Sequence, residues 1–478
     1  MKGLLGLKLN IALALIGIIA LGIIARCLHM VPGDHYYILS TDSYYFHHLT
    51  ERVIDGEDLP WFHQGLVYPL AWISKILPLS LACRTLPILL GILGVLGIYW
   101  SGSRIHSRRV GIASAFAWAL LPHSICITAA GFVDRDGLSV LLITAGALGF
   151  WLFKDKHWVL AGMVAAIIGE VIVWEWVYIG RWVLLGSIAG GMLGVGMLRS
   201  WRNLPWKAFI LLVVVSAFLS ITREGDLAQQ TSNTLNIASP WSDKSQGMAE
   251  LHSIDLPALI AWWGLFMLPI VAGAIIAIKQ RAEGPLFCVG WFAVAGLASI
   301  LASRCLVFTI PPACMLAGLA LATLAEGLQG KTFPLEAKRA LLAILAACFI
   351  FLTGSSMIFS YKLGDFKGMA PGDDWTQALA YLRNETPSDA VVLNHWDYGY
   401  WIRDIGERAP VSQGGPANSE GIGGVYAEPD LILGAMDKHQ ADYFIFPRSE
   451  ISLEEIDRED LKVAFTNEGV AIVGRCDE

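Results

Sequence analysis

Carboxylates stand at three separated places in this chain, in patterns that suit metal binding or the activation of a nucleophile. They are Asp42 in STDSYYFHHL, Asp134 and Asp136 in AGFVDRDG, and Glu250 in GMAELHSIDL. Carboxylate oxygens are ligands for hard divalent cations such as Mg²⁺ and Mn²⁺, and Asp134-x-Asp136 is a short chelating motif. Any one of these acids alone is more typical of a turn or a helix cap. An acid at the boundary of a membrane is a functional candidate by default, so the location of all four matters.

A cation and a short aromatic segment complete the set of candidates. Arg304, in LASRCLVFTIPPACMLAG, lies at the head of an apolar run, where an arginine either snorkels to the membrane interface or contacts a phosphate. The segment LNHWDYGYWIR contains His395, Trp396 and Asp397. Aspartate accepts hydrogen bonds and the Trp indole donates one, so the segment suits a ligand that carries a hydroxyl. Its structural alternative is a strand that runs into an aromatic turn packed on the core of a small domain.

The elements that must position these residues are mostly membrane helices. Of the 478 residues, 55% are hydrophobic and 16% are charged, whereas a soluble chain carries about 25% charged residues. Apolar runs near the roughly 20 residues that cross a bilayer recur along the chain. They lie around residues 10–28, 82–100, 110–130, 138–153, 157–175, 177–197, 207–221, 256–278, 284–302, 304–323 and 340–360. We therefore expect a polytopic α-helical membrane protein with about eleven spans, the first of which is an anchor because no small-residue cleavage site follows it.

The connectors between these runs predict an orientation. Basic residues gather in five of them: Arg104, Arg108 and Arg109; Lys154 and Lys156; Arg199, Arg202 and Lys207; Lys279 and Arg281; and Lys331, Lys338 and Arg339. Short basic loops stay on the cytoplasmic side, and all five fall there if the N-terminus is cytoplasmic. The acids of the first paragraph then lie on the outer side. The net charge of −7 gives no reason to expect nucleic acid as a partner.

A small soluble domain follows the last apolar run. Residues 1–360 form the predicted membrane domain, with outward loops at 29–80 and 222–255, and residues 361–478 read as an extracytoplasmic α/β domain. The loop at 222–255 is polar and long, which is typical of lids and of disordered segments. In the soluble domain we predict helices over 372–385, 429–439 and 452–460, strands over 390–394 and 441–446, and a hairpin over 461–475 that turns at Asn467-Glu468-Gly469.

The aromatic segment and the acids together resemble a known family, the catalytic subunit of oligosaccharyltransferases, which includes bacterial PglB and archaeal AglB. The hallmark of that family is a WWDYG segment after the last span, and here the segment reads His395-Trp396-Asp397-Tyr398-Gly399. The resemblance covers nearly the whole chain. It implies a GT-C membrane fold with about 11–13 transmembrane helices and a small C-terminal extracytoplasmic α/β domain.

The acids match the family's motifs one by one. Asp42 with the following SYYFHHL is similar to the first acidic motif, and Asp134-Arg135-Asp136 is similar to the second, the DxD/DxE motif. Glu250 looks like the glutamate of the TIxE motif in the mobile loop. Arg304 matches the position of the arginine that contacts the lipid phosphate.

This resemblance implies an activity and a role for each residue. The family transfers a glycan en bloc, with inversion, from a polyprenyl (pyro)phosphate carrier to the Asn of Asn-x-Ser/Thr in acceptor polypeptides. Asp42 and Glu250 would activate the acceptor amide, whose nitrogen is a poor nucleophile because its lone pair is delocalised. Asp42, Asp134 and Asp136 would hold Mn²⁺ or Mg²⁺ beside the leaving group.

The remaining matched residues would bind the two substrates. Arg304 would contact the lipid phosphate, and His395, Trp396 and Asp397 would bind the hydroxyl of the acceptor Ser or Thr. The expected location is the cell (inner) membrane, crossed several times, with the N-terminus cytoplasmic and the C-terminal domain extracytoplasmic.

Four departures from the family pattern are visible. His395 replaces the first Trp of the hallmark, and the interval from Asp136 to Glu250 is short, which accounts for about eleven spans where the family usually has thirteen. No DxxK or MxxI motif can be placed with convincing spacing, although Met436 and Lys438 are nearby. No Arg follows Glu250 within the next two dozen residues, so we expect no requirement for an acidic residue two positions before the acceptor Asn.

Two alternative functions remain open, one within the enzymes and one in a different class. Another GT-C transferase, which moves a lipid-linked sugar to a hydroxyl of a lipid, glycan or protein, would keep the acids and Arg304 but would not need the hydroxyl-binding segment. A transporter or flippase would place ionisable residues near the bilayer midplane. Apart from Glu170 and Glu175 the predicted spans contain almost none, which disfavours the transporter.

Overall fold

The chain divides into two units, and each unit consists of two segments that are separate in the sequence. The computed structural model describes residues 2–30, 38–58, 64–154, 157–175, 180–202, 204–223, 262–301, 303–329, 334–363, 371–413, 431–453, 456 and 460–475. Unit 1 consists of Met1–Tyr37 and Thr50–Leu363, and unit 2 consists of Ile38–Leu49 and Gly364–Glu478. We call them the membrane unit and the C-terminal unit.

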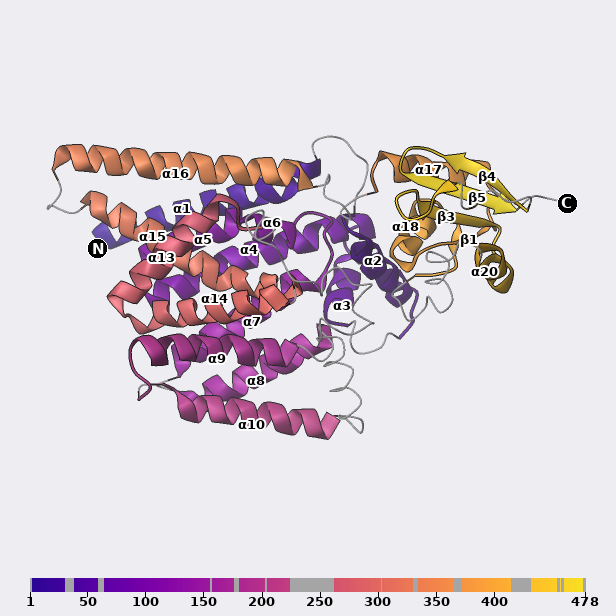
Figure 1. Cartoon of the computed structure of the whole chain (residues 1–478). Helices are drawn as coiled ribbons and strands as arrows, with labels where there is room; N and C mark the ends of the chain where they lie inside the picture. Colours follow the sequence, from indigo (N-terminus) through magenta and orange to yellow (C-terminus); the bar gives the residue numbers. More distant parts are fainter. Residues whose placement is uncertain are drawn as a thin grey trace. The chain divides into compact units, whose positions relative to one another are not determined.

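The membrane unit is a bundle of apolar helices (Figure 1). Its elements are α1 (Lys2–Cys27), η1 (Leu28–Met30), α3 (Gln64–Ile73), α4 (Leu79–Ile105), α5 (Arg108–Leu120), α6 (Pro122–Cys126), α7 (Arg135–Phe153), α8 (Trp158–Glu175), α9 (Gly180–Leu198), α10 (Trp206–Arg223), η5 (Gly264–Phe266), α13 (Met267–Gln280), α14 (Glu283–Leu301), η6 (Ser303–Thr309), α15 (Ile310–Gln329) and α16 (Leu335–Tyr361). Helix α2 (Thr41–Ile54) begins in the C-terminal unit and ends in this one.

Each of the eleven apolar segments predicted from the sequence contains helix in its described residues, and the segment 110–130 is divided between α5 and α6. Within the described residues, six helical stretches are long and apolar enough to cross a membrane, and four shorter apolar helices accompany them. Backbone polar groups in lipid must be bonded within their own segment, which is why apolar runs of this length become helices. The predicted multi-pass membrane protein is confirmed. The predicted loop at 29–80 contains the helices α2 and α3. They were not predicted, because neither is an apolar run long enough to cross a membrane.

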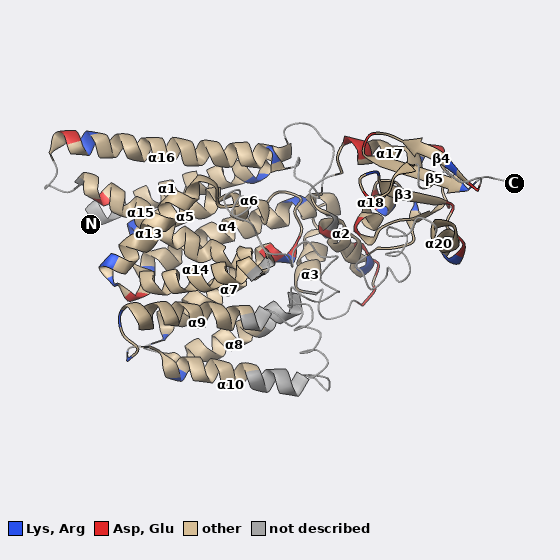
Figure 2. Cartoon of the chain, in the orientation of Figure 1, with Lys and Arg blue, Asp and Glu red and all other residues tan. Residues whose placement is uncertain are grey.

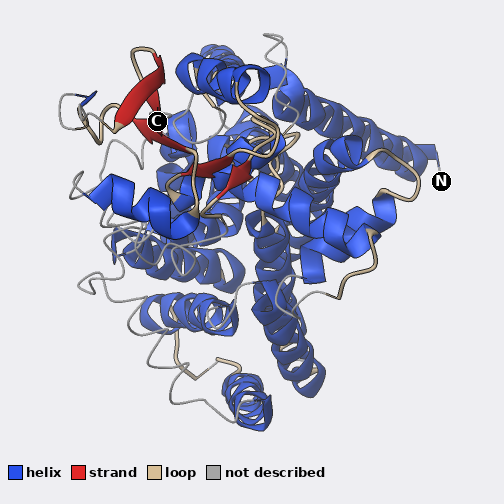
Figure 3. Cartoon of the chain, turned by 90° about the vertical axis from the view of Figure 1, so that its right-hand side faces the viewer, coloured by secondary structure: helices blue, strands red, loops and turns tan. Residues whose placement is uncertain are grey.

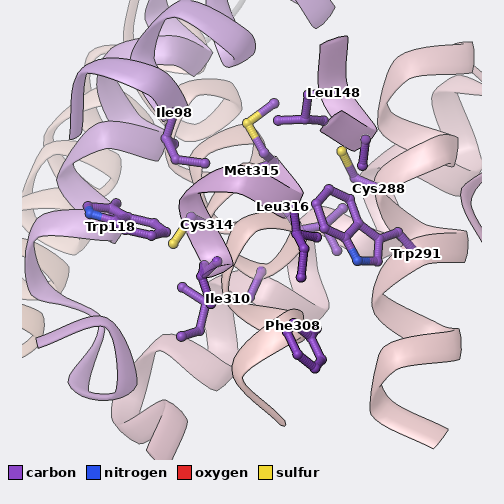
Figure 4. Close-up of a cluster of buried hydrophobic side chains, with 14 of the residues drawn as sticks. Ile98, Trp118, Leu148, Cys288, Trp291, Phe308, Ile310, Cys314, Met315 and Leu316 are labelled. Carbon is purple, nitrogen blue, oxygen red and sulfur yellow. The ribbon is translucent and has the colours of Figure 1, made fainter. Parts of the chain in front are cut away.

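Small residues and large aromatic residues together shape the core of the bundle. Helices α9 and α14 cross at Gly190, Gly194 and Gly290. An added Cβ would collide with the facing backbone at Gly194 and Gly290, and with the Val294 side chain at Gly190. Lipid provides no hydrophobic force that drives helices together, so membrane helices associate through close packing. Glycines four residues apart allow this packing, because they let the two backbones approach closely. Elsewhere the core is filled by large side chains such as Trp118 and Trp291, both fully buried (Figure 4).

The basic connectors meet at one end of the membrane unit. Lys154, after α7, and Arg199, after α9, both lie 3.6 Å from carboxylate oxygens of Glu283 at the start of α14. His106 Nε2, after α4, lies 3.3 Å from Oε1 of Gln280 at the end of α13. Figure 2 shows Lys and Arg at these turns. The structure therefore brings four separate connectors to the same end, which we call the connector end.

The C-terminal unit carries a mixed sheet, and Figure 3 shows strands there. Its described elements are α17 (Asp373–Glu385), β1 (Val391–Leu393), η8 (Trp396–Tyr398), α18 (Gly399–Asp404), β2 (Ala409–Pro410), α20 (Ile432–His439), β3 (Tyr443–Pro447), β4 (Leu461–Thr466) and β5 (Val470–Arg475). The strand order is β2-β1-β3-β5-β4, with β1 parallel to β2 and β3, and with β5 antiparallel to β3 and β4. Its apolar core includes Leu393, Met436 and Phe444.

Most elements that the sequence predicted for this unit are confirmed. The helices at 372–385 and 429–439, the two strands and the hairpin all form, and Asn467 Oδ1 accepts bonds from Gly469 N and Val470 N in the hairpin turn. The predicted helix over 452–460 lies largely outside the described residues, as does most of the 222–255 loop. Strand β2 and helix α18 were not predicted, because both are too short to show a periodic pattern.

Candidate active site

The aromatic segment is a half-buried turn held between two buried anchors. Asn394, at the end of β1, is fully buried, and its Nδ2 donates to the carbonyl oxygens of Ser412 and His395, both at 2.7 Å. Its Oδ1 accepts from the Ser412 backbone N–H at 3.3 Å. These bonds tie the strand end to the residues that follow β2, because a buried amide must find partners. The four residues from His395 to Tyr398 then lie half-buried at the surface.

The second anchor is α18, which starts at the glycine of the motif. An added Cβ at Gly399 would collide with the carbonyl oxygen of Ser412 and with Gln413. Gly399 and the three residues after it are buried. A glycine is therefore required here by close backbone approach, with a φ of −57° that any residue adopts. The sequence analysis identified Gly399 as the last residue of the WWDYG-like segment. The structure shows why a glycine is needed at this position.

Polar atoms of the turn suit the recognition of a hydroxyl. The side chains of His395 and Asp397 are 30% and 41% exposed, so both remain accessible to a ligand. The Asp397 backbone N–H donates to His395 Nδ1 at 3.4 Å, whereas Nδ1 also lies 3.5 Å from Asp397 Oδ2. Burial lowers the pKa of His395, so the neutral ring is favoured and Nδ1 acts as the acceptor. The ring proton then lies on Nε2, so this atom can donate a hydrogen bond.

Aromatic side chains from α17 and α18 pack against the residues of the turn. Trp375, on α17, packs against Tyr398 with 4.2 Å between ring centroids and against Trp401 at 5.8 Å. His395 lies 6.0 Å from Tyr398 between ring centroids. Burial raises the pKa of Tyr398, and the nearby carboxylates of Glu450 and Asp397 raise it further. Neither Trp375 nor Glu450 was singled out from the sequence, because each lies far along the chain from the motif.

The part of α2 that carries Asp42 belongs to the same unit as this turn. Asp42 is in the first turn of α2, and Tyr45 and His48 on that helix lie 5.5 Å and 6.2 Å from Tyr400 of α18 between ring centroids. Tyr400 is 6% exposed, and the Arg403 guanidinium lies over its ring at 5.4 Å. Burial raises the pKa of Tyr400 most, followed by Tyr45, with a smaller contribution from Asp42. The structure thus brings one predicted catalytic carboxylate and the predicted acceptor-binding turn into one unit.

Asp134 and Asp136 lie together at the start of α7 in the membrane unit. Asp134 is the N-cap of α7, is 9% exposed, and accepts a bond from the Arg135 backbone N–H at 2.6 Å. Asp136 is in the first helical turn. The positive end of the helix dipole favours ionised carboxylates there. Two adjacent carboxylates are a donor set that suits a hard divalent cation.

A buried arginine holds the segment that leads to these acids. Arg26, near the end of α1, is 1% exposed and donates to Thr128 Oγ1 at 2.7 Å, to Ser124 Oγ at 3.1 Å and to the Ala119 carbonyl at 3.0 Å. The Arg26 carbonyl accepts from Ala130 N at 2.9 Å. All partners of this guanidinium in the described part of the chain are neutral oxygens. The sequence signal was present, since Arg26 is the one charged residue in the apolar segment 10–28, but it was not singled out.

Two predicted site residues cannot be placed. Glu250 lies outside the described residues. The backbone of Arg304 is part of the 3₁₀ helix η6, but its side chain is not among the parts that the structure describes. Within the described residues, no group of three or more His, Cys, Asp or Glu residues forms a metal site. Asp42 belongs to one unit and the Asp134–Asp136 pair to the other. The roles of all these residues therefore stay predictions.

Comparison with known proteins finds relatives among glycosyltransferases. No family model matches the chain. The chain is 20% identical over 508 aligned residues to dolichyl-phosphooligosaccharide-protein glycotransferase 2 of Pyrococcus furiosus, and the alignment covers 84% of this chain and 66% of that protein. Over 39 residues it is 46% identical to subunit STT3B of the rice dolichyl-diphosphooligosaccharide–protein glycosyltransferase, covering 8% of this chain and 5% of that protein. The chain thus spans just under two thirds of the length of the Pyrococcus relative.

Solved structures identify the fold. The oligosaccharyltransferase of Archaeoglobus fulgidus superimposes with a TM-score of 0.69 at 14% identity, covering 91% of this chain and 69% of that one. ArnT of Cupriavidus metallidurans superimposes with a TM-score of 0.59 at 14% identity, covering 98% of both chains. The fold is therefore that of the GT-C membrane glycosyltransferases, and the predicted fold class is confirmed.

Proposed function

We propose that this chain is an oligosaccharyltransferase, which transfers a glycan en bloc from a polyprenyl (pyro)phosphate carrier to the Asn side chain of Asn-x-Ser/Thr in a polypeptide. The observation that carries the proposal is the half-exposed turn from His395 to Tyr398, fixed between the Asn394 bonds and the buried helix α18. It occurs in a chain similar to oligosaccharyltransferases in sequence and fold.

The acceptor would bind at this turn through its Ser or Thr hydroxyl. The Asp397 carboxylate would accept the hydroxyl proton, and the Trp396 indole and His395 Nε2 would donate to its oxygen. A site that bonds a hydroxyl rejects a ligand without one, because its own polar groups are then left unpaired. The A. fulgidus protein has been solved with a tethered acceptor peptide that contains an NVT sequon, which is consistent with such a ligand here.

The donor would bind at the membrane unit. Arg304 is proposed to contact the lipid phosphate, and a dolichol-phosphate has been found in the A. fulgidus protein. Asp42 and Glu250 would accept hydrogen bonds from the acceptor amide and favour a twisted, more nucleophilic form. Asp42, Asp134 and Asp136 would hold a divalent cation, and the A. fulgidus protein has been solved with Zn. Bound Mn²⁺ or Mg²⁺ would stabilise negative charge on the leaving phosphate.

The proposed location is the cell membrane, with the connector end facing the cytoplasm. The basic connectors support this orientation, because short loops rich in Lys and Arg are retained there. The C-terminal unit would then be extracytoplasmic. Labelling of single cysteines introduced at Ser200 and at Asp389 in a cysteine-free background tests it, since an impermeant reagent added to intact cells should reach only the second.

The decisive experiment compares three acceptor peptides. Membranes that contain the protein are incubated with a polyprenyl-linked glycan, Mn²⁺, and peptides with Asn-x-Thr, Asn-x-Ser or Asn-x-Ala. We expect glycopeptide from the first two and a strong loss with the third. Equal transfer to the Asn-x-Ala peptide would contradict the hydroxyl-binding turn, and full activity after EDTA would contradict the cation.

A second candidate is favoured by the likeness of the fold to another membrane glycosyltransferase. ArnT matches this chain over 98% of both lengths, and its structure holds undecaprenyl phosphate, so a GT-C transferase that modifies a hydroxyl of a lipid or glycan is the runner-up. Such an enzyme would not need Asp397. If the Asn-x-Thr peptide is inert but a sugar reaches a lipid acceptor, and Asp397→Asn leaves that transfer intact, the second function replaces the first.

A further inference from the structure

A hollow of about 420 Å³ opens among the connectors of the membrane unit. Its walls come from the end of α4, the end of α7, the residues after α9 and the start of α14. The charged and aromatic residues that line it are Arg104, Trp151, Lys154, Arg199 and Glu283. No part of the proposed transfer reaction uses these residues, so the hollow needs a separate explanation.

Among the described residues that line the hollow, there are three cations and one carboxylate. Lys154 Nζ and Arg199 Nη2 each lie 3.6 Å from a Glu283 carboxylate oxygen. Those separations exceed the roughly 2.7–2.9 Å of a strong charge-assisted hydrogen bond, so one carboxylate is shared loosely by two cations. Arg104, the third cation in the lining, has no hydrogen bond or ion pair within the described residues and is exposed.

Part of this charge has an ordinary structural explanation. Each cation follows or ends a helix, where the negative end of the helix dipole favours it, and Glu283 fixes three elements to one another. This explanation does not account for a hollow with unbalanced charge. Lys154 is also held in place, since its side chain is 5% exposed and its ammonium lies 4.5 Å from the centre of the Trp151 ring.

Exposed tryptophans mark the level of the membrane interface at this end. Trp100, Trp158, Trp201 and Trp206 are all more than a third exposed, and each lies within a few residues of a connector. Trp201 and Trp206 stack on each other with 6.3 Å between ring centroids. Tryptophan concentrates at the depth of lipid head groups, because its ring is apolar and its N–H is polar. The hollow is therefore at the depth where phospholipid phosphates lie.

We propose that this hollow binds the phosphodiester head group of an anionic phospholipid. The guanidinium groups of Arg104 and Arg199 would pair with phosphate oxygens, for which their planar donor geometry is suited. Basic pockets between membrane helices are known to bind anionic head groups in this way. The proposal requires only that the chain spans a membrane, so it is independent of the proposed reaction.

The test measures which lipids stay bound to the protein. The full chain is placed in nanodiscs of phosphatidylcholine with 30% phosphatidylglycerol, and retained lipid is counted by native mass spectrometry after transfer to detergent. We expect retained phosphatidylglycerol on the wild type, about fivefold weaker retention in Arg104→Gln or Arg199→Gln, and no change in Arg109→Gln. Arg109 is the matched control, since it lies at the same end but pairs with Glu326 at 3.5 Å, outside the hollow.

The variant Glu283→Gln separates the proposal from the structural explanation. If the hollow binds an anionic head group, removal of its carboxylate strengthens retention about fivefold. If the cations serve only to hold Glu283, this variant loses thermal stability and retains no more phosphatidylglycerol than the wild type, which would overturn the proposal. Equal loss in Arg109→Gln would also overturn it, as an effect of overall charge. A final arm titrates inorganic phosphate into phosphatidylcholine nanodiscs, and saturable binding there without retention of phosphatidylglycerol would reject the lipid as the source.

Discussion

At the scale of single residues, the properties of the proposed acceptor turn depend on His395 and Asp397. The two side chains compete for the same small set of donors and acceptors, because His395 Nδ1 faces both the N–H and the carboxylate of Asp397. The protonation state of His395 therefore decides whether the carboxylate is available to a hydroxyl.

We expect the acceptor affinity to fall at acidic pH in the wild type but not in His395→Trp. Burial holds the pKa of His395 below its usual value of about 6.5, so the ring charges only as the pH falls below that value. Once charged, Nδ1–H donates to Asp397 and competes with the acceptor hydroxyl. The measurement is kcat/KM for an Asn-x-Thr peptide between pH 5 and 8.

The lowered pKa of His395 should also reduce the stability of the folded protein at acidic pH, in the same direction as the effect on acceptor affinity. A His whose folded pKa is depressed binds more protons in the unfolded chain, so it disfavours folding as the pH falls below about 6.5. His395→Trp should remove both effects. A wild-type acid limb that persists unchanged in this variant would show that another group controls it.

The change Asp397→Asn should reduce kcat/KM for the Asn-x-Thr peptide by about 10- to 150-fold, the value of a hydrogen bond to a charged group. The effect should disappear with an Asn-x-Ala peptide, which offers no hydroxyl. Asp373→Asn is the control, because that carboxylate is exposed on α17 in the same unit. Equal losses with the two peptides would contradict direct contact with the hydroxyl.

At the scale of elements, helix α18 connects the acceptor turn to the helix that carries Asp42. Its first residue, Gly399, lies close to Ser412 and Gln413, which follow β2. Its second residue, Tyr400, packs against Tyr45 of α2. Both contacts lie inside the C-terminal unit. A change in α18 should therefore affect the turn and the proposed catalytic carboxylate together.

Gly399→Ala should destabilise the C-terminal unit by about 1–3 kcal/mol, the usual cost of an overpacked buried site. The added methyl group would collide with the Ser412 carbonyl. Gly434→Ala is the matched control, since nothing lies within 4 Å of its Cβ position in α20 and alanine favours a helix. Thermal unfolding followed by tryptophan fluorescence compares the two, and equal stability would refute the close approach.

Tyr400→Ala should lower kcat for peptide transfer about ten- to hundredfold, because misplacement of a catalytic group by about 1 Å has effects of that size. Tyr400→Phe keeps the ring and should change kcat little. Tyr381→Ala, which removes a ring packed 5.3 Å from Phe465, is the control for a general loss of packing. If both alanine variants lose the same activity, Tyr400 only stabilises the unit.

At the scale of the whole molecule, the predicted site residues are divided between the two units. The C-terminal unit gathers Ile38–Leu49 with residues more than 300 positions later, and the membrane unit holds Asp134 and Asp136 on α7. In the membrane unit, Arg26 joins α1 to the segment between α5 and α7 through bonds to neutral oxygens. It is therefore placed to fix the position of the acidic turn.

Arg26→Met should weaken Mn²⁺ binding about 10- to 100-fold, as loss of a residue that orients metal ligands does. Buried carbonyl groups would also be left without a donor, which lowers the free energy of unfolding by about 1–3 kcal/mol for each group. Electron paramagnetic resonance of Mn²⁺ measures the binding, and Arg109→Met controls for lost charge. A less stable protein with unchanged Mn²⁺ affinity would limit Arg26 to a structural role.

The sequence by itself determined the elements whose forces are local. Apolar runs of membrane length become helices because their backbone must bond internally, so each of the eleven predicted runs contains helix in its described residues. The hairpin at Asn467 and helix α17 followed from turn chemistry and periodicity. The proposed acceptor turn was predicted from a resemblance, which needs only the order of Trp396, Asp397 and Gly399, and its role stays a prediction.

Only the tertiary structure decided which distant groups meet. That Trp375 backs the turn, that Tyr400 packs against the Asp42 helix, and that Arg26 bonds across α5 and α6 all follow from packing between segments far apart in the sequence. The hollow at the connector end exists only because four helix ends converge. Such contacts depend on shape and burial across the fold, which residue types and spacing do not encode.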